Sequence, residues 1–452
     1  MFDAKINDIE IIRNLQNDIF SKLKKCWGYN VWFIIQIQLG VYFTYISSKY
    51  VNSKDLLNRG IIFGRKGYRS AFMNFLKSLY YLFFNYRKYK NKWREITILA
   101  GYKSNNIKRN ECSYNIYLEP YQILLNEKGV KNEVIWLDKI NDDKFFLSLY
   151  NINYFLLIIE KIFFPKHFLN VKYNANLVYS RLKDKYKHSV YLNNFISNNI
   201  ILNKLYYDTF RCLLKILTPK SIFTYSYYDN ILINPLIRAA NYLNIETAEY
   251  QHSHFSDLHY AYTKWDYIDE YRIFFPNKFF VWSDYHKNII NRNFSGKSYI
   301  PQIIVSGNYY IKQEKNNLIK KCASNDILVC LQGTWIPEFV EDVVINSNNI
   351  KWYFRLHPRC TEDKGKLFSF FSTYPDKVEI DKANNYTLYE LFGNVGTIIT
   401  IQSGAALEAK EFGLRIIIVD PYGYDCFKDY IDNGDFNYAE NEEQLLNLIN
   451  KK

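Results

Sequence analysis

The sequence lacks the patterns by which several classes of protein are identified. Its seven cysteines are scattered, odd in number and never spaced as C-x-x-C, which argues against a disulfide framework or a zinc site and favours a reducing cytoplasm. The first residues, MFDAKINDIE, are polar and mixed in charge, unlike a secretory signal. The motifs G-x-x-x-x-G-K-[ST] and G-x-G-x-x-G are both missing, which argues against P-loop and dinucleotide-binding proteins.

Long apolar runs are missing as well. The most apolar early stretch, Val31 to Ile46, contains Gln36, Gln38 and Gly40. It is shorter than the roughly 20 apolar residues that a membrane-spanning helix needs. We therefore expect a cytoplasmic protein whose contact with a membrane, if it has one, is peripheral and at the inner face.

Positive charge is in excess. The 452 residues contain 58 Lys and Arg against 45 Asp and Glu, a net charge of +13, which suits an anionic partner. The densest basic stretch runs from Arg65 to Lys92 and is interleaved with Tyr and Phe. Two interpretations stay open for it: a solvated face, or a patch that rests on the anionic headgroups of the inner membrane. No nucleic-acid partner is expected, because no recognised motif accompanies the charge.

Length and periodicity predict two α/β domains. A chain of this length is too long for one ordinary core, and short apolar runs alternate with helical patterns in both halves. This alternation predicts two Rossmann-like doubly wound parallel sheets that face a cleft. We place an N-terminal domain with helical, basic, aromatic-rich insertions at residues 1–305 and a C-terminal domain at 306–452. The polar segment from Ser306 to Asn325 is interpreted as the connection.

Two segments that follow predicted strands of the C-terminal domain carry the strongest functional signal. His357, followed by Pro358, is held at a strand end by a rigid turn, where its imidazole can donate to a leaving phosphate. Ser403 and Gly404 precede a helix whose unpaired N–H groups attract a phosphate. Each also has a structural interpretation, since a strand-end His is commonly structural and Ser403 suits an N-cap. Together they predict a phosphate site.

With these residues the second half resembles the nucleotide-binding domain of GT-B glycosyltransferases that make capsule and lipopolysaccharide glycans. The nearest groups use CMP-sugars: bacterial sialyltransferases, polysialyltransferases and Kdo transferases. In such sialyltransferases a His-Pro motif and a later Ser-Ser or Ser-Thr motif contact the CMP phosphate. His357-Pro358 resembles the first, whereas Ser403-Gly404 matches the second only in its first residue. The resemblance covers about Ser306 to Lys452 and implies a nucleotide-sugar donor, with CMP-sialic acid or CMP-Kdo preferred.

The resemblance also implies further contacts with the nucleotide. Family members use a carboxylate near the nucleoside, and Glu379 at a strand end is the matching candidate. In many GT-B enzymes a Glu one turn into the phosphate-binding helix holds the ribose, which makes Glu408 a rival. A solvated surface charge stays open for both. Gly333 and Thr334, after the first strand of the domain, resemble the loop that closes over the nucleotide.

An inverting transfer needs a base that deprotonates the acceptor hydroxyl, and the resemblance implies that it comes from the N-terminal domain. Asp229, just after a predicted strand, is the first candidate, with capping of the next helix as its structural alternative. His252 is the second, together with Glu249, and Gln251-His252 resembles the Gln-His pair of Kdo transferases.

No metal cofactor is expected. His252, His254 and His259, with Asp257 among them, match no standard zinc spacing. GT-B enzymes generally need no metal for chemistry, because a helix dipole, a His and basic groups can stabilise the leaving phosphate.

These observations predict an enzyme, a glycosyltransferase that moves a sugar to a hydroxyl of a surface-glycan or glycolipid acceptor. A sugar-nucleotide epimerase and a CDP-glycerol-type phosphotransferase on the same fold stay open as alternatives. An epimerase is expected to be more compact and less basic, and a phosphotransferase to carry a second Ser and an Asp where Gly404 and Ala405 stand. A non-catalytic glycan-assembly protein is the third possibility.

Overall fold

The protein divides into two units, which are described separately. The computed structural model describes residues 6–47, 67–109, 112–183, 192–229, 231–262, 271–317, 324–333, 335–357 and 363–450. The N-terminal unit runs to His252 and again from His259 to Gly307, and the C-terminal unit comprises Ser253–Leu258 and Asn308–Lys452. The division at Gly307 lies two residues beyond the predicted boundary. The strand pattern assigns Ser253–Leu258 to the N-terminal domain, whereas in the structure this short segment belongs to the C-terminal unit.

The N-terminal unit is built on a six-stranded parallel sheet with the order β4-β1-β5-β6-β7-β8. All five residues of its inner strand β1 are buried, as expected of a parallel strand covered by helices on both faces. The predicted doubly wound sheet is thereby confirmed. The strands are β1 (Thr97–Gly101), β4 (Asn132–Trp136), β5 (Ser221–Thr224), β6 (Glu246–Tyr250), β7 (Lys278–Val281) and β8 (Gln302–Val305).

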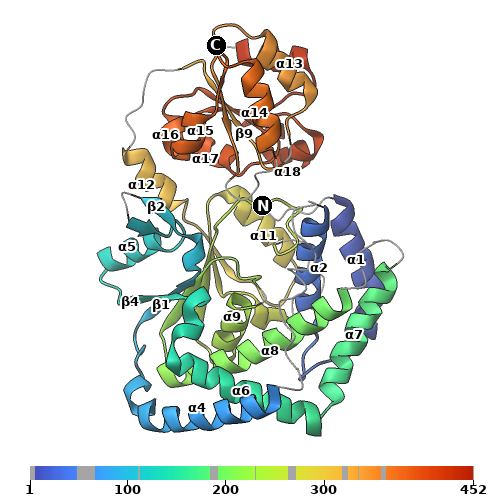
Figure 1. The fold of residues 1–452 in the computed structure, drawn as a ribbon, viewed down its shortest axis with the longest axis vertical. Helices are drawn as coiled ribbons and strands as arrows, with labels where there is room; N and C mark the ends of the chain where they lie inside the picture. Colours follow the sequence, from blue (N-terminus) through green and yellow to red (C-terminus); the bar gives the residue numbers. More distant parts are fainter. Residues whose placement is uncertain are drawn as a thin grey trace. The chain divides into compact units, whose positions relative to one another are not determined.

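Helices make up most of the rest of this unit (Figure 1). A short antiparallel hairpin, β2 (Ile107–Arg109) with β3 (Cys112–Tyr114), follows β1. The helices are α1 (Ile6–Ile19), α2 (Trp32–Ser47), α4 (Gly67–Tyr89), α5 (Glu119–Glu127), α6 (Lys144–Phe163), α7 (Lys166–Leu182), α8 (Leu192–Leu217), α9 (Ile233–Tyr242) and α11 (Asp284–Phe294).

The apolar stretch at Val31 to Ile46 forms α2, a helix of the protein core. The Gln36 amide nitrogen donates to the backbone carbonyl of Tyr260 at 3.4 Å inside the protein. Gly40 permits close packing, since a Cβ there would lie 2.6 Å from the Tyr260 ring. Among the residues that the structure describes, α6 is the one helix long and apolar enough to cross a membrane, and 33% of its apolar window is buried inside the protein.

A buried cation lies in the core between α8 and α9. The Arg238 side chain of α9 is 1% exposed, and its guanidinium stacks at 4.3 to 4.5 Å from the rings of Tyr29, Tyr207 and Phe274. It also donates to the amide oxygen of Asn203 on α8. Aromatic faces and one amide therefore take the place of a carboxylate partner in stabilising this charge.

The C-terminal unit contains a second six-stranded parallel sheet, with the order β11-β10-β9-β12-β13-β14. Residues on both faces of β9 are buried, which confirms the second doubly wound sheet. The strands are β9 (Ile327–Cys330), β10 (Trp352–Arg355), β11 (Val378–Glu379), β12 (Thr397–Thr400), β13 (Arg415–Ile418) and β14 (Asn437–Tyr438).

Helices cover both faces of this sheet (Figure 1). One core cluster joins Val329 and Phe354 of the strands with Val343 of α13, Leu367 of α14 and Leu445 of α19. The segment interpreted as a connection contains a helix, α12. The helices are α12 (Tyr309–Asn317), α13 (Glu338–Asn346), α14 (Lys364–Thr373), α15 (Asp381–Asn385), α16 (Leu388–Phe392), α17 (Ala405–Glu411), α18 (Pro421–Asp432) and α19 (Glu442–Asn450).

Candidate functional site

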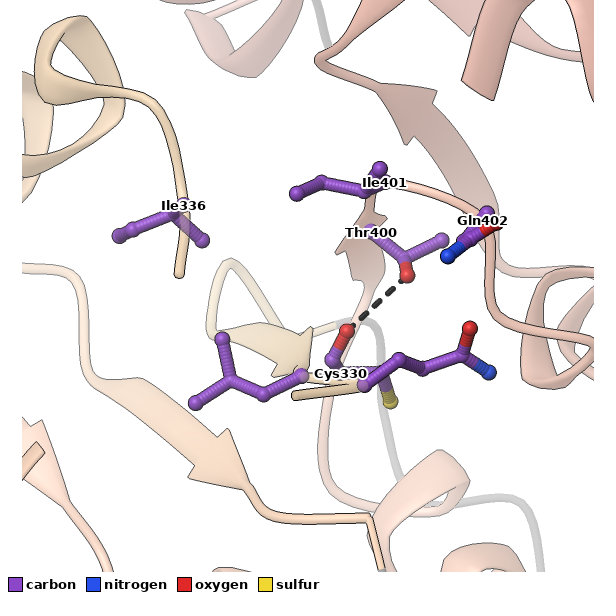
Figure 2. Close-up of a pocket in the computed structure, with 7 residues that line it drawn as sticks. Cys330, Ile336, Thr400, Ile401 and Gln402 are labelled. Atoms are coloured by element: carbon purple, nitrogen blue, oxygen red, sulfur yellow. Dashed lines mark hydrogen bonds between the residues drawn. The ribbon is translucent and has the colours of Figure 1, made fainter. Parts of the chain in front are cut away.

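A pocket lies at the carboxyl ends of β9 and β12 (Figure 2). These adjacent strands are the place where the strand order of the C-terminal sheet reverses, which is where open α/β sheets bind ligands. The space between its lining residues, about 240 Å³, is continuous with solvent, and the enclosed part of it has room for about one water molecule. It is lined by Cys330, Leu331, Gln332, Ile336, Thr400, Ile401 and Gln402.

Thr400 connects the two strands that form the pocket. It lies opposite Cys330 in the sheet register, and its hydroxyl donates to the Cys330 carbonyl at 3.0 Å (Figure 2). The same hydroxyl accepts the backbone N–H of Ser403 at 3.1 Å. One side chain therefore fixes both the spacing of the strand ends and the start of the turn that follows β12. The sequence analysis missed Thr400, because a Thr in a β-strand carries no functional signal by itself.

The N-terminal unit repeats this arrangement. Its strand order reverses between β1 and β5, and the hydroxyl of Thr224, the last residue of β5, donates to the Ala100 carbonyl of β1 at 3.0 Å. In both units a Thr hydroxyl thus joins the two strands at the reversal point. Thr400 and Thr224 are therefore equivalent positions, and they can be compared by the same substitution.

Ser403 lies in the turn predicted to hold the phosphate. Its side chain is buried, and its hydroxyl accepts the N–H of Ala405 at 3.3 Å, in the manner of a cap. Its backbone carbonyl accepts the Ala406 N–H at 3.0 Å. Gly404 is the N-cap of α17, a helix of seven residues. Ser403 is therefore not the N-cap of α17: its hydroxyl closes a tight turn one residue before the cap, directly beside the pocket residue Gln402.

His357 follows β10, the strand next to β9, and it is half-buried. Its position is set by Asn384 of α15. The Asn384 amide donates to the Phe354 carbonyl at 3.0 Å, and its oxygen accepts the Leu356 N–H at 2.9 Å. The Asn384 side chain thus bonds to the backbone at the end of β10 and fixes it as far as Leu356, the residue before His357. Pro358 lies outside the described residues.

The loop after β9 is held by a residue that the sequence analysis did not single out. Gly333 adopts a positive φ of 81°, which favours glycine. The buried carboxyl of Asp363 accepts the backbone N–H of Gly333, and burial raises the pKa of Asp363 despite this bond. Asp363 therefore fixes the loop that carries the pocket residue Gln332. Thr334 lies outside the described residues.

The two candidate carboxylates for the nucleoside have different surroundings. Glu408 on α17 accepts the Tyr389 hydroxyl at 2.6 Å, and burial raises its pKa although that bond and the charge of Arg355 favour ionisation. Glu379 belongs to the edge strand β11 and accepts the Lys382 N–H at 3.1 Å. β11 is two strands away from β9, roughly 10 Å across a sheet. Glu408 is therefore the better placed carboxylate, since its helix begins at the turn beside the pocket.

Asp229 follows β5 in the N-terminal unit. Its Oδ1 accepts the backbone N–H groups of Ile231 and Leu232 at 2.9 and 3.2 Å. Its Oδ2 accepts the hydroxyl of Tyr102 at 2.7 Å, and burial together with Asp229 holds the pKa of Tyr102 well above its usual range. Asp229 thus holds the turn before α9, whose N-cap is Leu232, and does not cap the helix itself. Both of its carboxylate oxygens accept hydrogen bonds.

His252 follows β6, the strand next to β5. Its ring lies 3.1 Å (Nε2) from the Ser226 hydroxyl and 3.5 Å from the hydroxyl of Tyr228. The ring is half-buried and has the aromatic rings of Tyr117 and Tyr225 at 5.8 and 5.9 Å. Ser226 itself has a positive φ of 56°, a backbone conformation uncommon for a residue other than glycine. His252 thus lies at the carboxyl edge of the sheet among hydroxyl groups.

The other residues of the histidine cluster have structural surroundings. His254 is completely buried in the C-terminal unit, stacks on Phe427 at 4.9 Å, and has its pKa lowered by burial to about 3. The His259 Nδ1 accepts the Ala261 N–H at 3.2 Å. Within the described ranges, no three His, Cys, Asp or Glu side chains come together in a way that could hold a metal.

The sequence matches no protein-family model and no curated protein. Solved structures similar to it include UDP-GlcNAc 2-epimerases from Methanocaldococcus jannaschii (14% identity, 79% of this chain and 93% of that chain, TM-score 0.41) and from Neisseria meningitidis (12%, 78% and 89%, 0.42). MurG of Acinetobacter baumannii is similar at 9% identity over 76% of this chain and 86% of that chain, with a TM-score of 0.39. At these values the similarity carries no argument about function, which must come from the residues of this chain.

Proposed function

We propose that this protein is a glycosyltransferase that binds the nucleotide of its sugar donor at the carboxyl ends of β9 and β12. The observation that carries the proposal is the pocket at the reversal point of the C-terminal sheet, next to the Ser403–Gly404 turn. Ligands of open α/β sheets bind at such a point. The pocket opens to solvent, where the rest of a nucleotide sugar would lie.

Five residues are assigned to the donor. The backbone at Ser403 and Gly404 approaches the phosphate, and the imidazole of His357 donates a hydrogen bond to it. Glu408 accepts hydrogen bonds from ribose hydroxyls, with Tyr389 holding its carboxyl in place. Arg355, whose guanidinium donates to the Ala383 carbonyl at 2.7 Å, supplies positive charge near Glu408.

The transfer step is an attack by an acceptor hydroxyl oxygen on the anomeric carbon of the donor sugar. The new C–O bond forms as the bond from the anomeric carbon to the phosphate oxygen breaks, and the nucleotide leaves with that electron pair. A base takes the hydroxyl proton. We assign this role to His252 in preference to Asp229, because both Asp229 oxygens already accept hydrogen bonds. We propose inversion at the anomeric carbon and no metal requirement.

The finer assignment is a cytoplasmic enzyme that uses a CMP-sugar and a surface-glycan or glycolipid acceptor. His357 supports the CMP-sugar, whereas Gly404 lacks the second hydroxyl of the resembling motif. The test incubates purified protein with CMP-sialic acid, CMP-Kdo and a panel of UDP-sugars, with and without mixed glycan acceptors. Release of nucleotide that depends on the acceptor supports transfer. Conversion of a UDP-sugar to its epimer without an acceptor supports the epimerase alternative and contradicts the proposal.

A variant separates catalysis from folding. His357→Ala is expected to lower turnover at least about a hundredfold while the unfolding temperature stays unchanged, because general acid and hydrogen-bond donors contribute on the order of 10²–10⁴ in rate. Glu379→Gln, at the sheet edge, is the matched control and should keep near-normal turnover. Full activity of His357→Ala removes this histidine from the mechanism.

A further inference from the structure

Helix α4 exposes its large apolar side chains to solvent. Among its described side chains, residues 68–89, the buried ones are Ala71 and Ser78. Tyr80, Phe83 and Phe84 are 70%, 81% and 64% exposed. A helix of a soluble protein normally places its large apolar residues toward the core, and on α4 several of them show the reverse.

The reversal follows from the way α4 packs on α6. The two helices lie antiparallel and side by side (Figure 1). Ser78 of α4 faces α6, and its hydroxyl accepts a hydrogen bond from the Asn151 amide at 3.3 Å. Phe75 and Tyr89 also face α6, where their rings lie 4.6 and 4.0 Å from those of Phe155 and Phe145. The exposed apolar residues recur at helical spacing around the rest of the helix, and Phe72 among them borders the contact with α6. They are Phe72, Met73, Leu76, Leu79, Tyr80, Phe83 and Phe84, which we name the α4 apolar face.

The end of α6 adds to this exposed apolar surface. Ile162 and Phe163 of α6 and the adjacent Phe164 are each at least 60% exposed. Phe155 of α6 contacts Phe72, so the α6 end lies toward the beginning of α4. The acidic residue of this region, Glu160, accepts the indole N–H of Trp27 at 2.7 Å.

The charge of the segment that carries the α4 apolar face has one sign, and at its end Lys92 pairs with Glu133 of β4 at 3.8 Å. Residues 67–94 contain seven Lys and Arg and no Asp or Glu. All seven are exposed: Arg69, Lys77, Arg87, Lys88, Lys90, Lys92 and Arg94. Exposed apolar patches of this extent mark interaction sites, and a basic rim around aromatic groups is typical of helices that lie in the interface of an anionic membrane.

We propose that the α4 apolar face binds the surface of an anionic lipid membrane, with α4 lying in the plane of the headgroups. Aromatic side chains enter the boundary between headgroups and acyl chains, and the lysines and arginines contact lipid phosphates. A second copy of the chain is the less favoured occupant. Two such faces, each basic and without acidic residues, repel one another when placed in contact.

The experiment measures binding of the full chain to sedimented vesicles. Vesicles of phosphatidylcholine with 30 mol% phosphatidylglycerol (about one third anionic lipid) are compared with phosphatidylcholine alone. We expect binding to the anionic vesicles that weakens strongly between about 0.1 and 0.5 M salt, because salt screens charges at a surface. The Phe83→Ser/Phe84→Ser variant is expected to bind at least about tenfold more weakly, since binding scales with the apolar area that enters the interface.

Two further variants complete the design. Lys77→Gln/Arg87→Gln/Lys88→Gln should lose binding to anionic vesicles while keeping its fold, as checked by circular dichroism. Phe368→Ser, which removes an exposed ring from α14 of the C-terminal unit, should bind like wild type. The proposal is overturned if wild type does not sediment with anionic vesicles, or if Phe83→Ser/Phe84→Ser binds unchanged. It is also overturned if that variant converts a dimer of the wild type to a monomer without affecting sedimentation with vesicles.

Discussion

Replacement of Glu249 by Gln is expected to change how the stability of the N-terminal unit depends on pH. The Glu249 side chain is 1% exposed on β6. One of its oxygens accepts the Tyr227 N–H at 3.1 Å, and the other accepts the hydroxyl of Tyr262. Burial raises its pKa from 4.5 to about 8 even though these bonds favour the ionised form. The folded protein therefore holds a proton that the unfolded chain releases.

The sign and size of the pH effect on stability follow from the difference in the Glu249 pKa between the folded and the unfolded protein. Because the pKa is raised in the folded state, the contribution of Glu249 to stability is complete below pH 4.5 and is lost as pH rises toward 8. The loss is about 1.4 kcal/mol per pH unit, or about 3 kcal/mol between pH 5.5 and 7.5. Gln does not ionise and loses nothing over this range. The free energy of unfolding of wild type minus that of Glu249→Gln should therefore fall by about 3 kcal/mol from pH 5.5 to 7.5.

Urea unfolding at four pH values between 5.5 and 8.5 measures this difference. His254, whose pKa is lowered by burial to about 3, has the opposite pH dependence, and it cancels because both proteins contain it. Glu246→Gln is the control on the same strand, where the carboxylate is an exposed partner of Lys278 at 2.7 Å. It should show a difference from wild type that does not change with pH. The reasoning is refuted if the Glu249→Gln difference is equally constant.

Three further variants test the packing and the donor site. Arg238→Ala should lower the free energy of unfolding by about 3 kcal/mol or more, measured by urea unfolding, because it removes a buried cation stacked on three aromatic rings. Gly423→Ala should destabilise the C-terminal unit and weaken nucleotide binding in calorimetry, since its Cβ would lie 1.9 Å from the carbonyl oxygen of the pocket residue Ile401. Glu408→Gln should weaken nucleotide binding about tenfold while Tyr389→Phe weakens it less, because a hydrogen bond to a charged group is worth about 1.5–3 kcal/mol. Equal losses in the two variants indicate that Glu408 only anchors the tyrosine.

Much of the fold is predictable from the sequence because parallel strands buried on both faces appear as short continuous apolar runs. The runs at Ile327 to Leu331 and at Thr397 to Ile401 contain β9 and β12, and each run ends one residue after its strand. Other elements were not predicted. α18 begins at Pro421 after the Asp420 cap, and its buried stripe of Gly423, Cys426, Phe427 and Tyr430 contains aromatic and small residues in place of a run of aliphatic ones. β14 has two residues, too few to show a period.

The candidate site is only partly predictable, and the reason is the same in each case. His357 and Ser403 could be selected because each follows an apolar strand. The residues that hold them in place, Asn384, Thr400 and Asp363, act through side-chain hydrogen bonds to backbone groups distant in sequence. Such pairings are set by the register and order of the strands, and no local pattern encodes them.

The exposed side of α4 could not be assigned from sequence either. Its aromatic residues recur at helical spacing, which fits a face that packs on a core as well as a face that binds a membrane. Which side of α4 is exposed depends on the side chains of α6 that pack against it. Ser78 pairs with Asn151 and Phe75 packs on Phe155 across the helix interface, whereas the rings of Tyr80, Phe83 and Phe84 stay exposed.

Nucleotide affinity of a matched pair of threonine variants tests the central claim most directly. Calorimetric titration first compares CMP, CDP, UDP and GDP on the wild type, and the tightest ligand is then titrated into Thr400→Val, Thr400→Ser and Thr224→Val. The donor-site assignment predicts at least about a tenfold loss of affinity for Thr400→Val, because the strand ends and the Ser403 turn lose their shared hydroxyl. Thr400→Ser and Thr224→Val, the second being the equivalent position of the N-terminal unit, should bind like wild type. Unchanged affinity in Thr400→Val, or a loss confined to Thr224→Val, contradicts the placement of the nucleotide at β9 and β12.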